Sequence, residues 1–119
     1  MSKYISRLAG SLAALALVGT VAAAAAEVPT QAQIEAATTA VQHEAIALSY
    51  DQEAAASESQ ANSHAKLAQT YRHAYSKSSP GAMASMASHC SRLEKNYHNA
   101  ASEFRMMADE HRKMAAAAK

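Results

Sequence analysis

The sequence predicts an all-α fold, a long antiparallel helical hairpin of the coiled-coil kind that pairs with a second copy to form a four-helix bundle. Two observations predict it. The 119 residues include only three glycines and two prolines, which leaves little material for turns. Two long stretches, separated by one Ser-Ser-Pro-Gly break, repeat small and apolar residues at heptad spacing. With a single cysteine, this composition excludes a sheet-rich fold, a Rossmann unit, a phosphate-binding loop and a disulfide scaffold.

Residues 1–26 have the pattern of a cleaved signal peptide. Two basic residues precede an apolar run (8–21), and three alanines (24–26) form a small-residue cleavage site. An uncleaved membrane anchor is the less favoured alternative, because small and hydroxyl residues fill much of the run. We therefore expect a periplasmic or secreted protein whose residues 27–119 form the hairpin.

The first long helix is predicted over residues 31–77. Thr30 and Gln33 form a capping box at its start, and neither glycine nor proline occurs before its end. The turn is predicted at residues 78–81, where proline disfavours helix at the residue before it. Ser79-Pro80 is also suited to begin the next helix, which is predicted over residues 82–118.

The second helix carries the clearest periodic signal in the chain. Steps of three and four residues predict an inward-facing set over more than four heptads. Its members are Met83, Met86, Cys90, Leu93, Tyr97, Ala100, Phe104, Met107, His111 and Met114.

The first helix carries two sets of residues at seven-residue spacing, which we call ladders. One is made of alanines: Ala40, Ala47, Ala54, Ala61 and Ala68. The other carries larger or polar side chains: His43, Tyr50, Ser57, His64 and Tyr71. We expect the alanines to let the helices approach while methionine, tyrosine and phenylalanine side chains of the second helix fill the space.

Charge predicts how two hairpins pair. Residues 27–65 hold six acidic residues and no lysine or arginine, whereas residues 66–95 hold five basic residues against one glutamate. Each hairpin is therefore positive at its turn and negative at its open end, which favours a head-to-tail homodimer that salt weakens. A single hairpin of this composition would also bury too little large apolar surface to be very stable.

The segment around Cys90 holds the best candidates for chemistry. Thiolate, thioether and imidazole together form the donor set that copper(I) prefers. The candidate metal ligands are Met86, His89, Cys90, Met83, His64 and His111. A second mixed cluster is expected where His43 meets His111, Met107 and Met114.

Simpler interpretations stay open for each of these residues. Methionine and free cysteine at such positions are most often core fillers. Cys90 could instead form an intermolecular disulfide, and the inward-facing histidines could hydrogen-bond to tyrosine or glutamate across the hairpin. His73 and His98 are interpreted as solvated surface.

No catalytic set stands out, so we expect no enzyme. His89 and Cys90 are neighbours on a helix and point about 100° apart, which prevents them from acting as a dyad. The paired Glu-x-x-His motifs of di-iron bundles and the Cys-x-x-Cys-His haem motif do not occur. Near-neutral charge and predicted export argue against a nucleic-acid partner.

The segments Met86-Ala87-Ser88-His89-Cys90 and His111-Arg112-Lys113-Met114-Ala115, with Tyr97 and Ala100-Ala101 between them, form a recurring pattern. It resembles a group of small exported helical-hairpin proteins of proteobacteria that have no assigned function. The resemblance covers mainly residues 83–115, and it implies the hairpin and the export signal but no activity. In size and class the chain is also similar to periplasmic helical stress proteins of the Spy and CpxP type, although it lacks their Leu-Thr-x-x-Gln motif.

These patterns together predict a non-enzymatic periplasmic helical-bundle protein that binds copper(I) through methionine, histidine and cysteine side chains. The alternative is an envelope-stress or protein-interaction module, chaperone-like or purely structural, whose partner is another periplasmic protein. Contact with a membrane is expected only if the signal peptide stays uncleaved.

Overall fold

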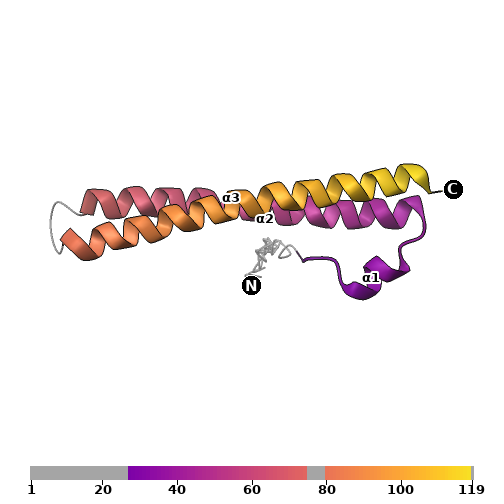
Figure 1. Cartoon of the computed structure of the whole chain (residues 1–119), viewed down its shortest axis with the longest axis horizontal. Helices are drawn as coiled ribbons and strands as arrows, with labels where there is room; N and C mark the ends of the chain where they lie inside the picture. Colours follow the sequence, from indigo (N-terminus) through magenta and orange to yellow (C-terminus); the bar gives the residue numbers. More distant parts are fainter. Residues whose placement is uncertain (1–26, 75–79, 119) are drawn as a thin grey trace, which may run out of the picture.

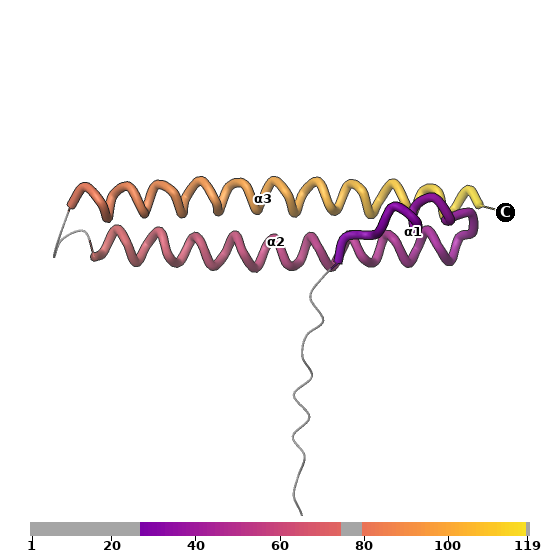
Figure 2. Tube along the Cα trace, turned by 90° about the horizontal axis from the view of Figure 1, so that it is seen from below, coloured from indigo at the N-terminus to yellow at the C-terminus, as the bar shows by residue number. Residues whose placement is uncertain are grey.

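A computed structural model describes residues 27–74 and 80–118 of the chain. These residues form three helices and no strand: α1 (Gln31–Ala36), α2 (Ala40–Ala74) and α3 (Pro80–Ala117). The two long helices lie side by side and antiparallel over nearly their whole length (Figures 1 and 2). The predicted all-α hairpin is confirmed, while the signal peptide predicted at 1–26 and the turn residues 78–79 lie outside the described residues.

The helix predicted over residues 31–77 is interrupted, which corrects that prediction. Helix α1 ends at Ala36, and α2 begins at Ala40 with Thr39 as its N-cap. The Thr39 hydroxyl accepts a hydrogen bond from the Gln42 amide at 3.3 Å, and the Gln42 side chain accepts one from the Thr39 amide at 3.1 Å. This second capping box stabilises a new helix start and separates α1 as a short hook at the open end of the hairpin (Figure 1).

Helix α3 begins two residues before the predicted start, at Pro80 and Gly81. Proline suits the first helical position because its missing amide would have no partner there and its φ is already helical. The 38 residues of α3 give a rod of about 57 Å, which α2 matches closely in length.

The two ladders predicted for the first helix are confirmed as the inner face of α2. Ala47, Ala54, Ala61 and Ala68 are buried, and only Ala40, the first residue of the helix, is exposed. Every member of the second ladder is buried or half-buried. Two of its rings stack against rings of α3, with centroid distances of 6.2 Å for Tyr50–Phe104 and 5.5 Å for His64–Tyr97.

The predicted inner face of α3 is right at six of its ten positions and wrong at four. The residues that are buried or half-buried as predicted are Met83, Cys90, Tyr97, Ala100, Phe104 and His111. The intervening large residues are exposed instead: Met86, Leu93, Met107 and Met114. At three of these positions the next residue is a buried alanine (Ala87, Ala108 and Ala115), and Ala101 is buried next to the half-buried Ala100.

The physical reason for this shift is the alanine ladder of α2. Helices whose facing positions are alanines approach closely, and methionine at those positions would hold the backbones apart. Ala108 is fully buried in one cluster with Ile46, Ala47 and Tyr50, against which Phe104 packs. Small residues therefore face one another along the hairpin, and the larger side chains pack beside them.

Within residues 27–74 and 80–118, none of the helices combines the length and the apolar character that crossing a membrane requires.

Candidate functional site

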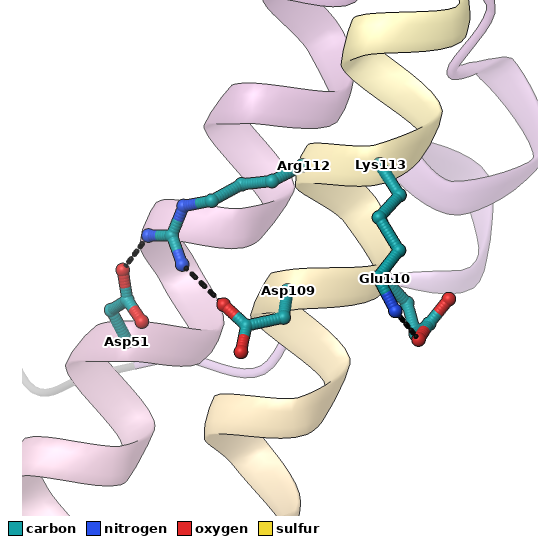
Figure 3. A network of polar contacts seen from close by, with 5 residues as sticks. All are labelled: Asp51, Asp109, Glu110, Arg112 and Lys113. Atoms are coloured by element: carbon teal, nitrogen blue, oxygen red, sulfur yellow. Dashed lines mark hydrogen bonds and ion pairs between the residues drawn. The ribbon is translucent and has the colours of Figure 1, made fainter.

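One side of the hairpin is held by polar contacts between the helices. Arg112 of α3 reaches across to Asp51 of α2 and also bonds to Asp109 one turn earlier on its own helix (Figure 3). Glu58 of α2 forms ion pairs with Arg105 and His98 of α3, with N···O distances of 3.2 Å and 3.0 Å. We call this the polar side, and it continues towards the turn with the hydrogen bond from Arg72 to Ser91 at 2.8 Å.

The ion-pairing residues of the polar side were not predicted from the sequence, although they recur in it at regular spacing. His98, Arg105 and Arg112 follow one another at seven-residue steps, each one residue after a ring of the α3 inner face. Asp51 and Glu58 repeat the same step on α2. The hydrogen bond from Arg112 to Asp51 is the main reason that the pKa of the guanidinium is raised, and Asp109 adds to it. His98 is half-exposed, as predicted, but it is also part of this set.

The opposite side of the hairpin exposes large apolar side chains. Each helix has two flanks beside its inner face, one made of the residues that precede inner-face positions and one made of the residues that follow them. Viewed down the helix axis, each flank lies about 80° from the centre of the inner face, so the two flanks point in opposite directions. Leu67 of α2 and Met86, Leu93, Met107 and Met114 of α3 form this second flank, which we call the apolar side. Between 39% and 47% of each side chain remains exposed.

The cysteine segment does not converge on a common point. Cys90 is buried in the inner face, and Met83 is half-buried beside it along the helix. Met86 lies on the apolar side, and His89 is exposed with its Nδ1 2.7 Å from an Arg92 guanidinium nitrogen. Copper binding at this segment therefore stays a prediction that would need Met86 and His89 to turn towards Cys90.

His64 lies in the inner face, where its ring stacks almost parallel to Tyr97, with 8° between the ring planes. Its Nδ1 is buried without a hydrogen-bond partner among the described residues. In residues 27–74 and 80–118, no group of three or more His, Cys, Asp or Glu side chains is arranged to hold a metal ion.

The second predicted cluster, at the open end, has its histidines in contact. His43, near the start of α2, and His111, near the end of α3, place their Nδ1 atoms 3.1 Å apart. The ring centroids are 5.4 Å apart, and Tyr50 lies 5.8 Å from His111 on the inner side. Both histidines are half-buried, so the pair stands where the inner face of the hairpin meets solvent.

An open cleft of about 210 Å³ adjoins this pair. It is lined by Tyr50, Met106, Met107, Glu110, His111 and Met114. Burial, and after it the positive charge that His43 can carry, lower the pKa of His111 below 6.5. The cleft thus places the imidazole of His111 beside thioethers, while Glu110 bonds to Lys113 at 2.6 Å and raises the pKa of that lysine (Figure 3).

Two of the features described above can engage a partner: the apolar side and the imidazole pair. Comparison with protein-family models, with curated proteins and with solved structures finds no match to this chain, so the functional argument rests on these residues.

Proposed function

We propose that the chain is a non-enzymatic, exported helical-hairpin protein that acts through protein association, and that two copies join along their apolar sides to form a four-helix bundle. The observation that carries this proposal is the row of exposed large apolar side chains along one flank: Leu67, Met86, Leu93, Met107 and Met114. The other flank is occupied by ion pairs within the hairpin. An apolar flank of this length marks a binding surface.

Charge favours a second copy as the occupant. Residues 40–65 of α2 include Glu44, Asp51, Glu53 and Glu58 and no lysine or arginine. The part of the hairpin nearer the turn carries an excess of basic residues: Lys66, Arg72, Arg92 and Lys95 against Glu94. When the turn of one copy lies against the open end of the other, these opposite charges meet.

The gain from burial is large enough for such a dimer. Covering a large apolar side chain completely is worth about 1.5–3 kcal/mol, so covering the exposed 39–47% of each is worth about 1 kcal/mol. Ten side chains in two copies then contribute about 10 kcal/mol, against an association cost of about 4–15 kcal/mol. Because the gain from burial and the cost of association are similar, the loss of a single apolar side chain should change the affinity of the dimer measurably.

The experiment is sedimentation equilibrium of the protein and of two matched variants. Leu93→Gln places an amide on the apolar side, whereas Leu48→Gln makes the same change at an exposed position of α2 outside the apolar side. Losing about 1 kcal/mol in each copy weakens the dimer by about 30-fold for Leu93→Gln. Equal effects of the two variants, or a wild-type protein that stays monomeric at tens of micromolar, would refute the proposal.

Export and the alternative partner belong to the same proposal. The predicted signal peptide favours the periplasm, where a lone buried thiol such as Cys90 is protected from oxidation by its burial.

If a different periplasmic protein rather than a second copy covers the apolar side, Leu93→Gln leaves the oligomeric state unchanged. In that case the wild-type protein should suppress the aggregation of a reduced, unfolding test protein, and Leu93→Gln should abolish this suppression.

A further inference from the structure

We propose that His43 and His111 form the core of a copper(I) site at the open end of the hairpin, completed by the thioether of Met107 or Met114 from the adjoining cleft. The cysteine segment takes no part in it. All of its ligands lie within one chain, so this inference does not need the association proposed above, although Met107 and Met114 also belong to the apolar side.

The two imidazoles have the spacing that a chelated ion needs. Their Nδ1 atoms are 3.1 Å apart, and they come from residues 68 positions apart in the sequence. An ion bound to both nitrogens at about 2.0 Å would see them at an angle of roughly 100°, which is close to tetrahedral. In the structure the same two atoms share a hydrogen bond, so an ion would replace the shared proton without moving the helices.

The thioethers lie next to His111 on α3, on the apolar side of the inner face to which His111 belongs. Met107 precedes it by four residues and Met114 follows it by three, and side chains at these spacings are neighbours on a helix. Both line the cleft that adjoins His111, and both are more than two-fifths exposed. Either side chain can therefore turn towards an ion without opening the inner face of the hairpin.

The donor set selects the ion. Imidazole and thioether together suit copper(I), whereas zinc sites are built from thiolate, imidazole and carboxylate. The one carboxylate that lines the cleft belongs to Glu110, and Lys113 holds it at 2.6 Å. Tyr50 closes the inner side of the site with its ring, which keeps water from one face of the ion.

Anaerobic competition for copper(I) against the chelator bicinchoninate, with the full chain, tests the site. We expect the protein to bind one ion. Replacing His43 or His111 by glutamine should weaken binding at least about 100-fold, because even changes to outer-shell residues cost about 10–100-fold. The double variant Met107→Leu, Met114→Leu should weaken it as well, whereas Met86→Leu, His98→Gln and Cys90→Ser should not.

Two further measurements keep the result interpretable. Circular dichroism must show the same helicity for the histidine variants, and X-ray absorption of the loaded protein should show both nitrogen and sulfur ligands. Binding that survives both histidine changes but is lost in Cys90→Ser, or the absence of any binding tighter than micromolar, overturns the proposal. Leu93→Gln should keep its affinity for copper(I) even where it weakens association, which separates a failure here from a failure of the dimer.

Discussion

The most decisive test of the packing compares two adjacent residues of α3, Met107 and Ala108. Ala108 is fully buried against Ile46, Ala47 and Tyr50, whereas Met107 is 42% exposed. The heptad pattern in the sequence places Met107 in the inner face, and the structure places Ala108 there. Substituting each residue by the other's side chain therefore distinguishes the two packings.

Ala108→Met adds three heavy atoms where two backbones are in close approach. Overpacking of a core typically costs about 1–3 kcal/mol, and the absence of any exposed surface at Ala108 puts the expected loss at the upper end. Met107→Ala removes a side chain that is already two-fifths exposed, so it should cost about 1 kcal/mol instead of the roughly 2–5 kcal/mol of a fully buried methionine.

Thermal unfolding followed by circular dichroism at one fixed protein concentration measures both changes. For a domain of this size 1 kcal/mol corresponds to about 4–8 °C, so Ala108→Met should lower the melting temperature by more than about 10 °C and Met107→Ala by less. Asn99→Met, at an exposed position of α3, controls for the helix propensity of methionine. A larger loss for Met107→Ala than for Ala108→Met would refute the packing described above.

The remaining predictions concern a titration and a helix start. Because the pKa of His111 is lowered below 6.5, the unfolded chain takes up a proton at this residue before the folded one as the pH falls. The free energy of unfolding should therefore decrease from pH 7.5 to 5.5, more steeply in the wild type than in His111→Gln; urea melts with identical pH slopes would contradict this. Thr39→Ala should cost about 1 kcal/mol and increase amide exchange in the first turn of α2, because it removes the hydroxyl that caps this helix, whereas Thr38→Ala should leave exchange there unchanged.

The sequence specified the elements of this protein through local signals. The shortage of glycine and proline, and the proline at the start of α3, fixed the two long helices, and the alanine and ring ladders fixed the inner face of α2. The break at residues 37–39 was equally local, since Thr39 and Gln42 repeat the motif of Thr30 and Gln33, but an uninterrupted helical composition concealed it.

The candidate site was predictable only in part. That His43 meets His111 follows from folding two ladders of equal spacing against each other. The separation of Met86 and His89 from Cys90 could not be predicted in this way. A residue next to an inner-face position can belong to either flank or to the inner face itself.

The amino-acid sequence by itself determined that the chain forms two long helices, which of their residues recur every seven positions, and how charge is distributed along them. The tertiary structure decided which of two adjacent residues turns inward at three heptads of α3, where methionine precedes Ala87, Ala108 and Ala115. Methionine and the alanine after it fit the repeat almost equally well, and the choice depends on how closely the α2 backbone approaches. That distance is a property of the pair of helices, so no single helix encodes it.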